Sequence, residues 1–187
     1  MEDAHHKLSN SLRCLGAVAC MAILLVRATR IATLGHALLY AASWVTFLHI
    51  CCGVYVFVRH LRAYSHAQQM LDAVAAGLLA ANVFFFTRPA IWSACLAAFT
   101  VVAITKYALL YPRAQDTSHR RYIRSKILLE TPGAILLGLT AGILFLGDLP
   151  VWLALGLQAA LLATTTTFAI WMIFIRRAYR KSAFAIA

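Results

Sequence analysis

The apolar run at residues 127–146, ILLETPGAILLGLTAGILFL, constrains this chain most. About twenty apolar residues are what an α-helix needs to cross the roughly 30 Å hydrocarbon core of a membrane. One carboxylate, Glu130, and the pair Pro132-Gly133 interrupt the run. A carboxylate in hydrocarbon is costly and generally faces a bundle interior or a wet cavity, while proline removes a backbone hydrogen bond. We therefore expect a broken helix that neighbouring helices must cover, with Glu130 as a candidate functional residue.

Five further apolar runs accompany this one, at residues 11–28, 31–58, 67–86, 90–111 and 151–175. Of the 187 residues, 63% are hydrophobic, and the mean hydropathy is +0.79. Such a composition is too apolar for a soluble domain of this length. The sequence therefore predicts an all-α fold, a polytopic membrane helix bundle of six transmembrane helices. Residues 1–187 are expected to form a single transmembrane helical domain with short loops and no soluble domain.

Lysine and arginine lie mainly in the gaps between the apolar runs, and the formal net charge is +11. Six crossings place both termini on one side of the membrane, together with thirteen of the 17 basic residues. Only Arg27, Arg30 and Arg88 fall on the other side, and Lys106 lies inside an apolar run. Because basic residues accumulate on the cytoplasmic side, both termini are expected in the cytoplasm, in a bacterial-type inner (plasma) membrane.

The longest polar stretch, residues 112–126, is expected to be a solvated loop that faces lipid headgroups. The basic residues of this chain therefore predict the lipid bilayer as the partner, and no nucleic acid.

Polar side chains inside the apolar runs are the candidate pathway residues: Glu130, Thr131, Lys106 and Thr165, the last within the run 164–167. Intramembrane ionisable groups mark solute, ion and proton pathways, and a helix broken at Pro132 would expose backbone groups to such a pathway. An alternative interpretation stays open. Glu130 would then lie one turn inside the membrane surface and pair with Arg124 or Lys126, and the threonines would bond to their own helix.

Small residues predict which helices pack closely. Gly138 and Gly142 form a GxxxG pair, and Ala73, Gly77 and Ala81 recur every four residues in the run 67–86. In lipid, small residues let two helix backbones approach each other. We expect the helices at 67–86 and 127–146 to pack together through these positions.

The sequence contains no familiar catalytic motif. GxSxG, HExxH, GxGxxG and P-loop patterns are all missing, and the chain has only six acidic residues. His49 and Cys52 are three residues apart, but two ligands on one helix do not complete a metal site. The sequence thus disfavours an enzyme without settling the question, and it predicts no metal site from these two residues.

Two short stretches resemble the HemJ-type and CopD-like families of small polytopic membrane proteins. One is Arg120-Arg121-Tyr122 followed by an apolar helix that carries Pro132-Gly133-Ala134. The other is His36 with Trp44 and Arg59. The resemblance implies a haem b or copper role, with His36 as the ligand carried over and Lys106 as its opposite partner.

Three classes of function remain. Glu130 and the expected break at Pro132 favour a transporter-like or channel-like protein that moves a small solute or ion. His36 and the family resemblance favour a haem b-binding or metal-binding membrane redox protein. The small size of the chain is compatible with a homo-oligomer, or with a subunit or assembly factor of a larger membrane complex.

Overall fold

The chain is helical in nearly all of the part that the computed structural model describes, residues 2–60, 65–114, 117–147 and 149–184. Within those ranges there are six α-helices and no strand. The helices are α1 Glu2–Arg27, α2 Leu34–His60, α3 His66–Phe84, α4 Pro89–Leu110, α5 Thr117–Phe145 and α6 Val151–Phe184, with short 3-10 helices at Ala28–Arg30 and Tyr111–Arg113. The prediction of an all-helical chain is confirmed.

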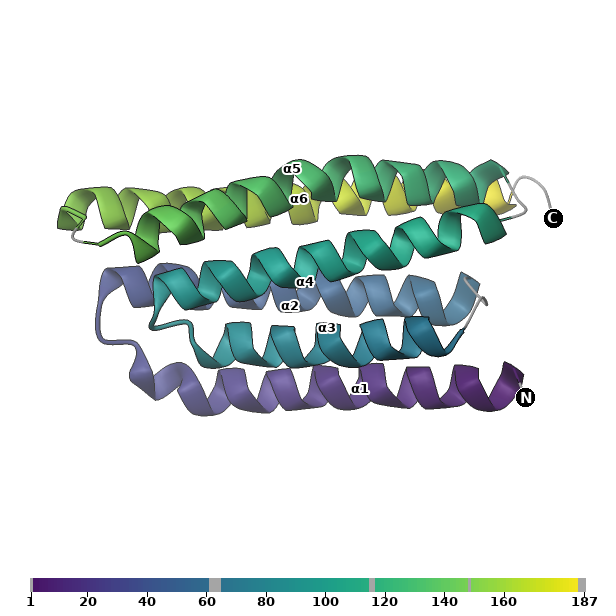
Figure 1. Cartoon of the computed structure of the whole chain (residues 1–187), viewed down its shortest axis with the longest axis horizontal. Coiled ribbons are helices and arrows are strands. Elements are labelled where there is room, and N and C mark those ends of the chain that lie inside the picture. The colour runs from purple at the N-terminus through teal and green to yellow at the C-terminus, as the bar shows by residue number, and fades with distance from the viewer. Residues whose placement is uncertain (1, 61–64, 115–116, 148, 185–187) are drawn as a thin grey trace.

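The six helices lie roughly side by side, alternate in direction along the chain and form a closed ring (Figure 1). The order around the ring is α1, α3, α4, α5, α6 and α2, and α2 packs back on α1. Neighbours in the chain are therefore not always close neighbours in space, since α2 packs mainly on α6. This order brings side chains from distant parts of the sequence into one interior.

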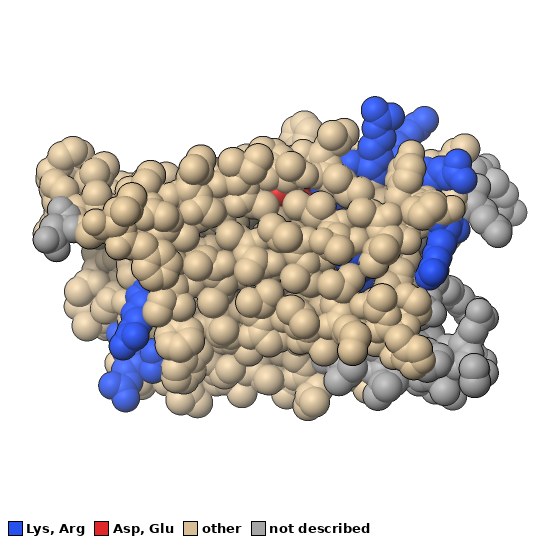
Figure 2. Space-filling view, viewed as in Figure 1, with Lys and Arg blue, Asp and Glu red and all other residues tan. Residues whose placement is uncertain are grey.

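Four helices are long and apolar enough to cross a membrane, over Leu34–Cys51, Pro89–Arg113, His119–Phe145 and Val151–Trp171. Figure 2 shows a matching charge distribution, with lysine and arginine gathered at the two ends of the molecule and very little charge between them. Among the described residues, α1 and α3 do not meet the same combined criteria of length, hydropathy and charge. Four such helices indicate a membrane protein.

The bundle buries a set of polar side chains and exposes many large apolar ones. Buried side chains include Gln68, Asp72 and Asn82, whereas the large apolar side chains of Leu146 and Trp152 are 90% and 73% exposed. In water this distribution would be unfavourable, because the free energy falls when apolar surface is removed from water. In lipid it is favourable, since hydrocarbon tails accept an apolar surface and polar groups find partners inside the bundle.

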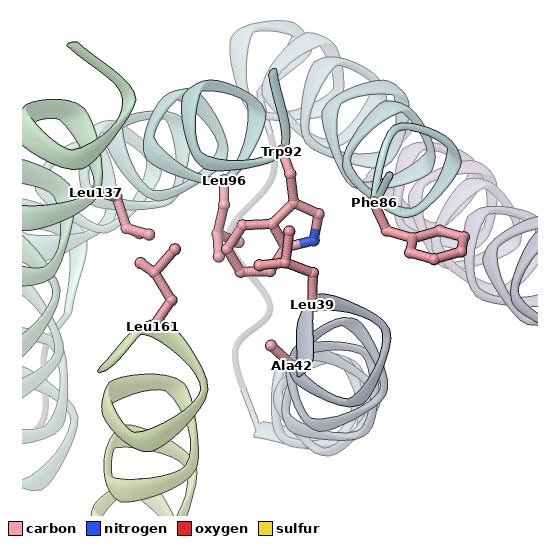
Figure 3. Close-up of a cluster of buried hydrophobic side chains, with 7 residues drawn as sticks. All are labelled: Leu39, Ala42, Phe86, Trp92, Leu96, Leu137 and Leu161. Atoms are coloured by element: carbon pink, nitrogen blue, oxygen red, sulfur yellow. The ribbon is translucent and has the colours of Figure 1, made fainter. Parts of the chain in front are cut away.

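An apolar cluster holds the bundle together at the end where α3 turns into α4 (Figure 3). Its buried members are Leu39, Ala42, Phe86, Trp92, Leu96, Leu137 and Leu161. The indole Nε1 of Trp92 donates to Ser43 Oγ at 2.8 Å, and Asn82 Nδ2 donates to the Trp92 carbonyl oxygen at 2.8 Å. These two hydrogen bonds connect α2, α3 and α4 through one buried residue, Trp92.

Helix α5 corrects two predictions from the sequence. The helix begins at Thr117, so most of the expected loop at 112–126 is helical, and it continues through Pro132 without a break. The polar stretch is amphipathic: Tyr122 and Ile123 are buried against α4, while its arginines face outward. Proline removes one backbone hydrogen bond, and packing on α4 and α6 supports the continuous helix through that position.

The expected packing of α3 on α5 is also wrong. In the ring, α4 lies between them, and Gly77, Gly138 and Gly142 are exposed, with no atom of another described helix within 4 Å of the position where a Cβ would stand. The close helix approach lies elsewhere. A Cβ built on Gly16 of α1 would stand 3.0 Å from the Ala76 Cβ of α3. A side chain at Gly16 would therefore be tightly crowded where α1 meets α3.

Candidate functional site

Two buried ion pairs lie inside the ring. The Lys106 ammonium of α4 pairs with the Asp72 carboxylate of α3, and Lys126 pairs with Glu130 one turn further along α5. All four residues are buried, and Lys126 and Glu130 are only 3% and 5% exposed. Removing a charge from water costs several kcal/mol in effect, so each of these charges depends on its partner. Neither pair is a surface salt bridge.

All four charged residues line one pocket of about 130 Å³, which we call the charged pocket. Residues from α1 to α5 form its walls. His49 of α2 and Tyr107 of α4 supply further polar groups, and the remaining walls are mostly alanine and larger apolar side chains. A site of this polarity and size has room for several water molecules.

A second pocket of about 90 Å³ adjoins the first, and we call it the threonine pocket. Four hydroxyl-bearing residues line it, Thr46, Thr100, Thr164 and Thr165. The two pockets share His49, Ile50, Phe99 and Glu130. Glu130 and His49 therefore stand where a charged compartment meets a compartment of hydroxyl groups.

Glu130 lies level with the middle of the bundle. His49 and Phe99, which line both pockets with it, stand near the midpoints of α2 and α4. Because α5 begins at Thr117, about 20 Å of helix precede Glu130, at roughly 1.5 Å per residue. The alternative interpretation holds in part, since two of the threonines do bond to their own helices. The pair with Lys126 is present, but Glu130 lies far deeper than one turn from the end of its helix.

The two oxygens of Glu130 differ. Oε1 lies 2.5 Å from Lys126 Nζ, whereas Oε2 is buried and has no hydrogen-bond partner among the described residues. Lys126 Nζ also lies 5.3 Å from the centre of the Tyr107 ring and 5.8 Å from that of Phe168. The Phe168 ring in turn makes an edge contact with His49 at 5.1 Å. Aromatic rings thus surround the ammonium group that faces Glu130.

The structure brings three of the four predicted pathway residues together. Glu130 and Lys106 line the charged pocket, and Thr165 lines the threonine pocket, where its hydroxyl donates to the Leu162 carbonyl oxygen at 3.0 Å. Thr131 lies apart from them. It is exposed, its hydroxyl donates to the Ile127 carbonyl oxygen at 2.7 Å, and it lines neither pocket.

His36 and Lys106 do not face each other as two ligands of one haem would. His36 makes an edge contact with Phe86, which follows the last residue of α3. Lys106 pairs instead with Asp72, in the second turn of α3. Asp72 and the last residue of α3, Phe84, are separated by about 18 Å of helix. The chain's own residues therefore do not fit a haem held between these two side chains. In the described part of the chain, no three His, Cys, Asp or Glu residues cluster closely enough to hold a metal ion.

Sequence reasoning missed Asp72 and His49 as members of the site. A signal for Asp72 was present, because Asp72 lies six residues after the start of α3 and Lys106 four residues before the end of α4. These helices are antiparallel neighbours, so an acid and a base at similar depth can meet. His49 had no such signal, since its role depends on which side of α2 faces the ring interior.

No protein-family model, curated protein or solved structure matches this chain. The resemblance to the HemJ-type and CopD-like families stays a prediction, and the function must be argued from the geometry of the two pockets.

Proposed function

We propose that this protein moves a small solute or ion across a membrane through the interior of a bundle of six membrane-spanning helices. One observation carries the proposal: two buried ion pairs and His49 line a pocket that continues, at Glu130, into a second pocket of hydroxyl groups at mid-bundle. Polar and ionisable groups placed this deep in an apolar bundle are typical of a pathway.

Stability alone is a poor explanation for the four buried charges. Replacing a buried ion pair by apolar side chains of similar size is often neutral or stabilising. The whole chain has six acidic residues, and two of them line this one pocket. A purely structural interior would be simpler to build from leucine and alanine, which the rest of the chain supplies in abundance.

The six-span arrangement is supported by the walls of the charged pocket. Gly16 and Ala17 of α1 and Asp72 and Ala76 of α3 form part of those walls, so both helices belong to the ring that encloses the pathway. With six spans, the excess of basic residues at the end that carries both termini favours a cytoplasmic location for that end.

Flux into liposomes tests this function. The purified protein is reconstituted, and entry of protons, Na⁺, K⁺ and Cl⁻ is followed with trapped dyes, while urea and glycerol are followed by light scattering. We expect at least one species to enter faster than in protein-free liposomes, and Glu130→Gln to abolish the difference. Thr131→Ala is the matched control, because it changes the adjacent residue outside both pockets. Equal rates with and without folded protein for all six species would contradict the proposal.

A further inference from the structure

We infer, on the basis of the proposed function, that the species moved is the proton and that Glu130 carries it between the charged pocket and the threonine pocket. Glu130 lines both pockets, its Oε1 pairs with Lys126, and its Oε2 has no hydrogen-bond partner in the described part of the chain. A buried carboxylate oxygen without a donor is an acceptor that a proton can occupy without displacing another group.

The pockets suit a proton better than a larger cargo. Sites for organic ligands generally occupy about 300–1,000 Å³, well above the size of either pocket here. Hard metal cations such as Ca²⁺ require about six to eight oxygen ligands. The charged pocket offers instead two carboxylates, each already paired with a lysine whose ammonium group repels a metal cation. A proton needs one acceptor and a few water molecules.

The proton crosses between the pockets in two steps. A hydronium ion in the charged pocket gives its proton to Glu130 Oε2, leaving a water molecule and a neutral carboxylic acid. The acid then gives the proton to water in the threonine pocket, and the carboxylate pairs again with Lys126. Thr164 and Thr165 line that second pocket, and the Thr165 hydroxyl, which donates to the Leu162 carbonyl oxygen, can still accept a hydrogen bond from such water.

The aromatic rings beside Lys126 stabilise its ammonium group when Glu130 is in the neutral form. When Glu130 is protonated, Lys126 loses its ionic partner, and an isolated buried ammonium is very unfavourable. The Tyr107 and Phe168 rings, 5.3 Å and 5.8 Å away, hold the cation against their faces throughout. A desolvated cation–π contact stabilises the ammonium group. Lys126 can therefore stay in place while Glu130 changes charge.

The other ionisable groups around Glu130 set how its protonation responds to pH. His49 and Cys51 face the charged pocket from α2, Asp72 from α3, and Lys106 and Tyr107 from α4. Lys126 shares α5 with Glu130. The residues that α6 contributes to the threonine pocket, Leu161, Thr164, Thr165 and Phe168, do not ionise. The two lysines and two carboxylates sum to zero charge, so one bound proton leaves the pocket at +1 and opposes a second.

Buried leucines make part of the threonine pocket apolar and so disfavour an open water pore there. Leu96, Leu137 and Leu161 come from α4, α5 and α6, point toward one another and line the threonine pocket (Figure 3). A water-filled pore would pass any small ion, whereas a carboxylate between two small pockets admits a proton that hops onto it and off again. Selectivity thus follows from Glu130 and the leucines together.

Two measurements on the full-length protein test the inference. Proton entry into liposomes is followed with a trapped pH dye in the presence of a potassium ionophore, and infrared difference spectra record the C=O band of protonated carboxyl groups as the pH changes. We expect a reversible band that is missing in Glu130→Gln and kept in Glu130→Asp and Thr131→Ala. We expect Glu130→Gln to reduce proton entry to the rate of protein-free liposomes, and Glu130→Asp to retain part of it.

The outcomes separate the inference from the proposed function. A band that does not change with pH, or proton entry that persists in Glu130→Gln, overturns the role of Glu130 as proton carrier. If Na⁺ or urea enters while protons do not, the transport function stands and the proton inference fails. If the Glu130 band changes with pH but no species crosses the membrane, the transport function itself is wrong.

Discussion

The two buried ion pairs lie close together but connect different parts of the molecule. Lys106 and Asp72 belong to neighbouring helices, so their attraction holds α3 against α4, whereas Lys126 and Glu130 lie one turn apart on α5. Breaking the first pair leaves a buried charge that has lost its closest ionic partner. Breaking the second leaves Lys126 with the rings of Tyr107 and Phe168.

Asp72→Asn and Lys106→Met are each expected to lower the free energy of unfolding by about 3–5 kcal/mol, because each leaves its partner's charge buried without its counter-charge. The double change Asp72→Leu with Lys106→Met should restore much of this loss. Thermal unfolding in detergent, followed by tryptophan fluorescence, measures all three. Glu130→Gln is the comparison and should cost less. Single changes that leave the melting temperature unchanged would show that the pair contributes nothing to holding α3 on α4.

At the scale of the helices, the face that each helix buries depends on which helices pack beside it in the tertiary structure. Helix α5 is continuous because its polar first turns bury Tyr122 and Ile123 on α4, and the exposed Pro132 removes only one of its backbone hydrogen bonds. The GxxxG pair of α5 faces outward. A neighbouring helix backbone comes close instead at Gly16, on a helix with no comparable motif.

Gly16→Leu is expected to destabilise the bundle, because a side chain there would force α1 away from Ala76 of α3. Inserting bulk into a close contact generally costs about 1–3 kcal/mol. Gly138→Leu is the matched control, since it adds the same side chain where no atom lies within 4 Å, and such outward changes stay within about 0.5 kcal/mol. Melting temperatures in detergent decide between them. Equal losses for both variants would mean that Gly138 also meets a partner, such as a second copy of the chain.

For the whole molecule, the alternating direction of the helices predicts which turns lie on which side of the membrane. The helices alternate in direction, so the turn after α1 and the turn between α3 and α4 share one end, while the start of α3 and the start of α5 share the other (Figure 1). Arg30 and Arg88 mark the first end, and His66 and Thr117 mark the second; all four are exposed.

Cysteine labelling tests the six-span topology. In a variant without the native cysteines, single changes Arg30→Cys and Arg88→Cys are expected to react with a membrane-impermeant maleimide added outside intact cells. His66→Cys and Thr117→Cys should react only after the cells are opened. Labelling of His66→Cys from outside would show that α3 does not cross the membrane in the expected direction. Labelling of Thr117→Cys from outside would show the same for α5, which begins at that residue.

The sequence by itself determined the secondary structure class and two of the ionisable residues of the candidate site. Long apolar runs predict helices, since only helices satisfy every backbone hydrogen bond in lipid, and four of the described helices have the length and hydropathy to span. Glu130 and Lys106 stand out because an ionisable residue in an apolar run is visible in the sequence. Six spans, cytoplasmic termini and transport stay predictions.

Only the tertiary structure decided which polar groups meet. Hydropathy and charge are sums over residues adjacent in the chain, whereas the charged pocket depends on which sides of five separate helices face one another. The packing order puts α2 between α1 and α6, so His49 lines both pockets with Glu130, and it puts α4 between α3 and α5, so Asp72 meets Lys106. That order is set by long-range van der Waals packing, to which contacts at Gly16 and Trp92 contribute and which no local pattern of residues records.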